Sequence, residues 1–337
     1  MTTENTHHPI ELTAAEISSL WASYQNDTLN ICAIRFFLIH VDDPQIHELL
    51  EEALKIAKES KIKTEQIFNH ENHPVPQGFT NKDVNFKAPR LFSDKMYLHY
   101  VLNITNLNTT AETTAITMAA RSDIIDFYSN KLKLELQLYK KAIELAKQQG
   151  TYIRTPIIPK PDKVEFVEKE SFLTGWFGNR RPLLGIEIAN LDYAARRNAL
   201  GQAGIIGFSQ VADNKDVRQY FEKGRDIAKK HNDIFNDILH EDYLPGGRPM
   251  TSEVTDSTVA PFSDKLMMNV VTNLIATGIS QYGTAMSASP RHDLGVTYTR
   301  LIAEIAKYSN EGANILIKNG WMEQPPIAAD RKNLAKR

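Results

Sequence analysis

The sequence predicts an all-α protein built from two similar halves. The phrase Phe-Ser-Asp-Lys occurs at residues 92–95 and again at 262–265, which sets a constant offset between the halves. Apolar residues recur at the three- and four-residue spacing of amphipathic helices, and strand signals are nearly absent. A repeat of this length indicates duplicated domains rather than a solenoid of short units.

The two halves align over most of their length. The offset set by the phrase continues without a gap to Gly150 and Gly320. Before the phrase the offset increases by one after a single loop adjustment, so that "AEISSLW" from residue 15 lies on "IEIANLD" from residue 186. We therefore expect a first domain over residues 1–150, a connecting segment over 151–182, and a second domain with a C-terminal tail over 183–337.

Composition and charge narrow the class of protein. The 337 residues are 42% hydrophobic and 24% charged, with a net charge of -2, which is typical of a folded protein with two domains. Because acidic and basic residues are interspersed, we expect no nucleic-acid partner. No stretch approaches the ~20 apolar residues of a membrane helix, and the start resembles no signal peptide, so a cytoplasmic protein is expected. Cys32 is the sole cysteine, which excludes an internal disulfide and a thiolate-cluster metal site.

Four helices are predicted in the first half from apolar residues at helical spacing. Asp43 is expected to cap the second helix, with Pro44 in its first turn. Ser93 is expected to cap the third helix, after a long crossover that is rich in proline. The predicted order is a helix through residues 17–38, one from 44 to about 70, one from 93, and one from about 124 to 149.

The second half repeats this plan, with helices near residues 184–212, 216–241, 263–287 and 292–318. Two short connections and a long one between the second and third helices are typical of a ferritin-like four-helix bundle. We therefore expect two tandem ferritin-like four-helix bundles. The glycines of "GQAGIIG" at residues 201–207 lie inside a helix, where they are expected to let another helix approach rather than bind a nucleotide.

The connecting segment begins with prolines that favour an extended chain. It then contains four aromatic residues, which are Phe166, Phe172, Trp176 and Phe177. They are too apolar for a free linker and are expected to pack across a bundle or into a protein partner. Two linked bundles can mimic a dimer of single bundles, and further association into a homo-oligomer is compatible with this design.

A ferritin-like bundle raises the question of a di-metal centre. Such a centre uses a Glu on each of two helices and a Glu-x-x-His motif on each of the other two. The eight predicted helices contain no Glu-x-x-His, and the nearest form is Asp237-x-x-His240. We therefore expect no cofactor, and bound iron or manganese is the alternative.

Two levels of each bundle nevertheless gather residue types that bind metals. At mid-height we expect a buried hydrogen-bonded network or a metal ion, formed by Asp27, Ser60, Asn103 and Glu135 in the first copy and by Asn198, His231, Asn273 and Glu304 in the second. At one end we expect helix capping or a zinc, iron or manganese site, formed by Glu16, His70, Glu71 and Asp94 and by Glu187, His240, Glu241 and Asp264.

The fourth helix of each half begins at "ARSD" or "PRHD". Here we expect an N-cap Ser or Asp with a neighbouring ion pair, between Arg121 and Asp123 and between Arg291 and Asp293. A phosphate site is the weaker alternative because the Asp would oppose an anion.

Several long motifs resemble a known family. They are "SSLWASYQND", "NFKAPRLFSDK", "SFLTGWFGNRRPL", "SEVTDSTVAPFSDKLMM" and "AKYSNEGANILIKNGWMEQPP". With its two copies, the chain resembles the tandem ferritin-like proteins of spore-forming bacilli, domain-of-unknown-function family 3231. The resemblance implies a ferritin-like fold in each half and a cytoplasmic bacterial protein with no established activity. A more distant likeness to spore-coat ferritin-like proteins implies a sporulation or stress setting.

Two functional hypotheses remain after the sequence is considered. The first is a non-catalytic structural or interaction protein, because the di-iron ligands are missing. The alternative is a metal-binding oxidoreductase or storage protein that uses the acidic and histidine candidates above. A ligand pocket between helices is a third possibility. Whether the chain is an enzyme is left open.

Overall fold

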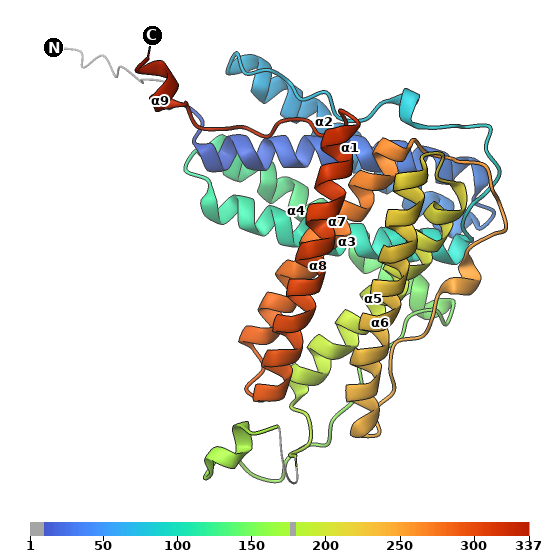
Figure 1. Ribbon diagram of the computed structural model, residues 1–337, viewed down its shortest axis with the longest axis vertical. Coiled ribbons are helices and arrows are strands. Elements are labelled where there is room, and N and C mark those ends of the chain that lie inside the picture. Colours follow the sequence, from blue (N-terminus) through green and yellow to red (C-terminus); the bar gives the residue numbers. More distant parts are fainter. Residues whose placement is uncertain (1–9, 176–179, 337) are drawn as a thin grey trace.

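The computed structural model describes residues 10–175 and 180–336 (Figure 1). Over these ranges the chain is all-helical, as predicted, and two isolated β-bridges are its only extended pairing. The first half contains α1 (Ala14–His40), α2 (Pro44–His70), α3 (Asp94–Met118) and α4 (Ser122–Gln148). The second half contains α5 (Gly185–Val211), α6 (Lys215–Glu241), α7 (Asp264–Ser287) and α8 (His292–Lys318), and the short α9 (Arg331–Leu334) follows. Three 3-10 turns lie between them, η1 (Asn81–Asp83), η2 (Glu170–Leu173) and η3 (Thr251–Glu253).

Helices α2 and α3 begin directly after their predicted capping residues, and α7 begins after the equivalent serine. The Asp43 carboxylate accepts hydrogen bonds from the amides of the second and third residues of α2, at 2.8 and 3.1 Å. Ser93 and Ser263 accept from the third amides of α3 and α7, at 3.2 and 3.1 Å. Each cap satisfies amides that would otherwise lack a partner inside the helix.

The helices of each half pack as two pairs. Helix α1 packs on α2 and α3 on α4, and the pairs meet through α2, α3 and α4 and through α1 and α3. The second half repeats this with α5 on α6 and α7 on α8, joined through α5 and α7 and through α6 and α8. In Figure 1, α5 to α8 run steeply through the view, whereas α1 and α4 run across it, so the long axes of the two halves cross. None of the described helices is long and apolar enough to span a membrane.

The connection from α2 to α3 spans the length of the helices. The Asp94 carboxylate, at the start of α3, accepts hydrogen bonds from the amides of Asp42 and Asp43 at 3.1 and 2.8 Å. Those two residues join α1 to α2, so α3 begins at the end opposite to the start of α1 and runs parallel to α2. Asp264 makes the same bonds at the α5–α6 junction.

The crossovers of the two halves pair with each other. Val84 forms an antiparallel bridge with Phe262, and Phe92 forms one with Val254. These two bridges are equivalent under the alignment of the two halves, which places Phe92 on Phe262 and Val84 on Val254. Contacts that are exchanged in this reciprocal way relate the two halves by a pseudo-twofold axis, as in an isologous dimer.

The repeated phrase lies at this pairing surface. The Ser93 hydroxyl donates to the Glu253 carboxylate of the other half at 2.6 Å. The Ser263 hydroxyl donates in turn to Asp83 at 2.8 Å. Each crossover therefore supports the start of the third helix in the other half, which explains why the phrase occurs twice.

The two halves share a hydrophobic core. The ring of Phe262 lies 5.3 Å from that of Phe36 in the first half, measured between centroids. Phe92 approaches α5 so closely that a Cβ added at Gly207 would lie 2.7 Å from its ring. The packing role predicted for the glycines of α5 is thus confirmed at Gly207, whereas Gly201 has no such neighbour.

The aromatic residues of the connecting segment differ in their surroundings. Phe172 lies under the guanidinium of Arg181, whose central carbon is 4.4 Å from the ring centroid. Phe166 is 87% exposed and makes no such packing contact within the described residues. Trp176 and Phe177 lie outside the described residues. Phe172 therefore packs on a residue of its own segment and Phe166 is exposed, so packing of either residue across a bundle stays a prediction.

A stacked tyrosine pair between α6 and α8 leads to a stability prediction. The rings of Tyr220 and Tyr308 lie 4.1 Å apart, and a Cβ added at Gly224 would lie 2.1 Å from the Tyr308 hydroxyl. We expect Gly224→Ala to lower the free energy of unfolding by about 1–2 kcal/mol, because overpacking outweighs the better helix propensity of Ala. Urea denaturation followed by circular dichroism measures this change.

The control for this prediction is another helical glycine. An added Cβ at Gly283 meets no atom within 4 Å. Gly283→Ala should therefore raise stability by about 0.5–1 kcal/mol. Equal effects of the two substitutions would contradict the overpacking argument.

Candidate functional site

Glu16, a predicted metal candidate, caps a neighbouring helix. Its carboxylate accepts hydrogen bonds from the amides of Ala120 and Arg121 at 2.9 and 2.8 Å, at the start of α4. It also accepts from the Thr13 amide at 2.7 Å. Burial opposes ionisation of Glu16, but the hydrogen bonds from Thr13, Arg121 and Ala120 outweigh it and hold the pKa at about 2. This carboxylate is therefore ionised and already engaged.

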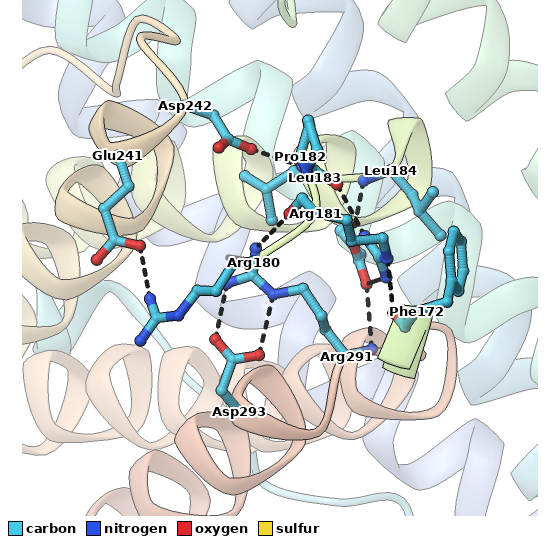
Figure 2. Close-up of polar contacts among 11 residues, drawn as sticks. Phe172, Arg180, Arg181, Pro182, Leu183, Leu184, Glu241, Asp242, Arg291 and Asp293 are labelled. Atoms are coloured by element: carbon cyan, nitrogen blue, oxygen red, sulfur yellow. Dashed lines mark hydrogen bonds and ion pairs between the residues drawn. The ribbon is translucent and has the colours of Figure 1, made fainter. Parts of the chain in front are cut away.

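Glu187 occupies the equivalent place in the second half, and Figure 2 labels its hydrogen-bond donors Arg181, Leu184 and Arg291. Both of its oxygens pair with the Arg181 guanidinium at 2.8 Å, and one accepts from the Leu184 amide at 2.9 Å. The Arg291 amide, at the start of α8, donates to it at 3.3 Å. Burial raises the pKa of Glu187, yet the hydrogen bonds from Arg181 and Leu184 bring it below its ordinary value.

The starts of α4 and α8 differ in part from the expectation. The predicted ion pairs form, with Arg121 2.8 Å from Asp123 and Arg291 2.7 Å from Asp293. The expected Ser or Asp cap is wrong, because the arginines occupy the N-cap positions and no side chain of their own segment caps the helix. The first-helix glutamates Glu16 and Glu187 instead accept from the amides of the N-cap arginines themselves.

The four residues expected to converge at one end of each half do not all meet there. Asp94 and Asp264 bind amides at the α1–α2 and α5–α6 junctions. Glu16 and Glu187 lie at the other end, where α4 and α8 begin. The expectation is wrong because each long crossover carries the chain back along the helices before α3 or α7 begins.

The remaining end candidates lie at or just after the ends of α2 and α6, and Glu71 shares Arg121 with Glu16. His70 and His240 are exposed at the ends of α2 and α6. Glu71 and Glu241 each pair with an arginine at 2.8 Å, and the second pair is visible in Figure 2. In the described part of the chain, no group of three or more His, Cys, Asp or Glu side chains is placed to hold a metal ion.

The centre of the first half holds a buried charged network. The Asp27 carboxylate accepts a hydrogen bond from the Ser60 hydroxyl at 2.5 Å and one from the Lys131 ammonium at 3.0 Å. The same ammonium lies 3.6 Å from Glu112. The Lys131 side chain is only 5% exposed, so its charge is balanced mainly by the Asp27 carboxylate rather than by water.

A second part of the network joins α3 to α4. The Asn108 amide donates to the Glu135 carboxylate at 2.8 Å and accepts from Asn26 at 2.9 Å. The predicted mid-height level is therefore correct for Asp27, Ser60 and Glu135, and Asn108 takes the place expected for Asn103. The prediction from sequence placed the start of the third helix, at Asp94, beside the start of the first helix, near Glu16. In the structure α3 begins at the opposite end, which moves the polar level along α3.

Burial changes the protonation of this network. Burial raises the pKa of Glu112 to about 8 and that of Glu135 to about 7, although Lys131 opposes both shifts. Burial also raises the pKa of Asp27, while Lys131 and Ser60 limit the rise. Burial alone would lower the pKa of Lys131, but attraction to Asp27 and Glu112 outweighs it and raises that pKa, so the lysine stays charged.

The centre of the second half is also hydrogen-bonded, but it contains one carboxylate instead of several. One ring nitrogen of His231 lies 3.0 Å from Glu304, and the other lies 3.2 Å from the Tyr282 hydroxyl. Asn198 donates to that hydroxyl at 2.7 Å. Burial lowers the pKa of His231 despite Glu304, so the ring is neutral near pH 7. The expected level is confirmed for these residues except Asn273, which is exposed.

Sequence analysis missed Lys131, Glu112 and Tyr282. A signal for the first was present, because Ile124, Tyr128, Lys131, Glu135 and Leu138 follow the spacing of one buried helix face, and all are buried. A lysine and a glutamate on an apolar face indicate a buried pair. Glu112 and Tyr282 are equivalent when Phe92 is aligned with Phe262, so the two centres use the same places with different chemistry.

The site and fold together define an all-helical protein with two copies of one unit and a different polar centre in each copy. The chain belongs to the family described as Protein of unknown function (DUF3231), whose model matches residues 1–164 and again residues 171–334. No curated protein matches significantly. A solved structure described as a "putative spore coat protein" from Bacillus halodurans C-125 is similar, with 18% identity and a TM-score of 0.41. That similarity covers 45% of this chain and 98% of the other.

Proposed function

We propose that each half is a ferritin-like four-helix bundle without a metal centre, and that the protein is a non-catalytic structural or interaction protein. The parallel course of α2 and α3, joined by one long crossover, supports the ferritin-like assignment. The proposed domains are residues 1–150 and 183–337, with 151–182 as the connecting segment. The cytoplasmic location and the sporulation or stress setting that the resemblance implies remain expectations.

The position of the Lys131 ammonium is the main support for this proposal. It lies between Asp27 and Glu112, at the mid-height level where di-metal proteins of this architecture gather their carboxylates. A protonated lysine donates hydrogen bonds and has no lone pair to offer a metal. The ammonium therefore supplies the positive charge that a metal ion would supply, and it occupies the space between the carboxylates.

The second bundle supports the same conclusion through its donor set. Around His231 stand a phenol, an amide and a single carboxylate, that of Glu304. Glu304 also pairs with Lys230 at 2.8 Å. One imidazole and one shared carboxylate are too few for a dinuclear centre.

The connecting segment supports the interaction part of the proposal. Apolar side chains that a folded protein usually buries are exposed along residues 157–167, including Ile157 at 81%, Val164 at 84% and Phe166 at 87%. Exposed apolar patches are typical of surfaces that contact another protein, and these side chains lie close together in the sequence. We therefore propose that this segment contacts a protein partner.

Metal analysis tests the proposal. Untagged protein, purified without chelator and then incubated with Fe(II) or Mn(II) and desalted, should retain far less than one metal ion per chain by plasma mass spectrometry. Thermal unfolding should also be unchanged by chelator. One or two tightly bound ions per chain, lost together with thermal stability on chelation, would overturn the proposal and favour the metal-binding alternative.

A further inference from the structure

The pseudo-twofold relation creates two equivalent positions between the halves. Each lies between the first helix of one half and the segment after the fourth helix of the other. The alignment that places "AEISSLW" on "IEIANLD" makes Gln25 on α1 equivalent to Arg196 on α5. The alignment that places Gly150 on Gly320 makes Ile153 after α4 equivalent to Glu323 after α8. The first position therefore combines a neutral Gln25 with an acidic Glu323, whereas the second combines a basic Arg196 with an apolar Ile153.

The backbone confirms that the segments after α4 and α8 are equivalent. Gly150 and Gly320 end these helices with positive φ angles of 64° and 67°. The next amides, of Thr151 and Trp321, donate to the carbonyls of Ala146 and Leu316 at 2.9 and 2.8 Å. The third residue after each glycine, Ile153 or Glu323, is thus carried by the same local backbone.

One position is filled by a carboxylate of the protein itself. Glu323 accepts a hydrogen bond from the Gln25 side chain at 2.6 Å. It also accepts from the amides of Gln77 and Gly78 at 2.9 and 3.2 Å. Three donors from the first half therefore converge on a carboxylate that the second half supplies.

The other position opens into a cavity of about 210 Å³ that Ile153 lines. Arg196 donates to the Ile153 carbonyl at 3.1 Å, because the isoleucine side chain offers no acceptor. The Nε atom of Arg196 is buried and has no hydrogen-bond partner within the described residues. In one position a carboxylate, Glu323, faces its donors. In the equivalent position Ile153 takes the place of that carboxylate, and the guanidinium of Arg196 is left with an unused donor.

The lining of this cavity carries an excess of positive charge. Lys95, Arg196, Arg197 and Arg248 line it, and no Asp or Glu does so among the described residues. Lys95 and Arg196 are paired with carboxylates outside the lining, at 2.9 and 2.8 Å. Arg197 and Arg248 form no ion pair within the described part of the chain.

Arg197 is the residue with the strongest requirement for an anion. Its guanidinium donates to the neutral side chains of Thr277 and Gln281, at 2.8 and 3.2 Å. Burial lowers the pKa of Arg197, which means that its charge is incompletely compensated by its surroundings. A buried charge without an opposite charge is costly, and a bound anion would remove that cost.

We propose that this cavity binds a small organic carboxylate with an aromatic or apolar body. The carboxylate is held by Arg196 and Arg197, through N–H groups beyond those that already donate to Ile153, Thr155, Thr277 and Gln281. The body contacts the rings of Tyr139, Tyr152 and Tyr193, which also line the cavity. Pockets for drug-sized ligands measure about 300–1,000 Å³, so this smaller cavity suits a smaller ligand.

Isothermal titration with phenylacetate tests the proposal on the full-length protein. We expect saturable binding of one phenylacetate per chain. Benzylamine, which has a similar size and the opposite charge, should show no saturable binding. The same titrations with benzoate and acetate separate the contribution of the ring from that of the carboxylate.

A substitution taken from the other half provides a sharp variant. Ile153→Glu places a carboxylate at the position that Glu323 occupies in the equivalent place, so it should weaken phenylacetate binding at least about tenfold. Ile157→Glu is the matched control, since Ile157 is 81% exposed, and it should leave binding unchanged. Circular dichroism confirms that both variants are folded.

Two arginine variants complete the test. Arg197→Gln should weaken phenylacetate binding at least about tenfold, which corresponds to ~1.4 kcal/mol. Arg248 is exposed, so Arg248→Gln should fold normally and weaken binding about two- to fivefold. The proposal is overturned if phenylacetate, benzoate and acetate all fail to bind, if benzylamine binds equally well, or if Ile153→Glu and Arg248→Gln both leave binding unchanged.

Discussion

Lys131→Met is expected to lower the free energy of unfolding by about 3–5 kcal/mol. The substitution removes the ammonium that lies 3.0 Å from Asp27 and 3.6 Å from Glu112. Asp27 is then a buried carboxylate whose remaining hydrogen bond comes from Ser60. Burying a charge without a partner costs several kcal/mol, or forces the group to take up a proton. Urea denaturation at pH 7, followed by circular dichroism, measures the loss.

The control is another lysine on the same helix. Lys141 pairs with Glu52 at 2.6 Å, but its side chain is 60% exposed. Lys141→Met should therefore change stability by less than about 1 kcal/mol. Adding Asp27→Asn to Lys131→Met should restore part of the loss, because no unpaired charge then remains. A loss below about 1 kcal/mol for Lys131→Met would show that the network is hydrated and that its pairing is unimportant.

The second large effect concerns pH. Burial raises the pKa of Glu112 to about 8, far above the ordinary value of 4.5. The folded state therefore binds a proton that the unfolded state releases, so this group favours folding at low pH, and the benefit is lost as pH rises through about 8. Burial lowers the pKa of His231, so its ring loses its proton at lower pH than Glu112 does. We expect the free energy of unfolding to fall by about 1–2 kcal/mol between pH 7 and pH 9.

Glu112→Gln isolates this contribution. The amide resembles the protonated acid and cannot ionise, so the variant should lose most of the decline between pH 7 and pH 9. Glu144→Gln is the control, because Glu144 is 56% exposed and should leave the slope unchanged. Denaturation curves at several pH values supply the measurement. The same slope in wild type and Glu112→Gln would place the source of the pH dependence elsewhere.

The helix boundaries were predictable because the signals are local. Asp43 and Ser93 bond amides two or three residues further along the chain. Gly150 adopts the positive φ that is favourable after a helix end. The register between the halves was also predictable, since Phe92 and Phe262 begin the same phrase. The polar level around Asp27 could be anticipated from the spacing of polar residues on apolar helix faces.

The direction of α3 could not be predicted from the same signals. Ser93 caps α3 in the same way whichever end of the half the helix starts from. The prediction from sequence therefore placed Asp94 at the wrong end. Its position depends on contacts with Asp42 and Asp43, which lie far earlier in the chain. The reciprocal pairing of Ser93 with Glu253 joins the two halves and has no counterpart in local periodicity.

The sequence by itself determined that this protein is helical, duplicated, and poor in the ligands of a di-metal centre. Periodicity, capping and repetition suffice for this, since each is recorded in neighbouring residues or in direct identity between the halves. Only the tertiary structure decided that Lys131 neutralises the first centre and that Glu323 fills one of two equivalent positions. Those outcomes depend on which distant side chains share one buried space, where an unpaired charge is costly.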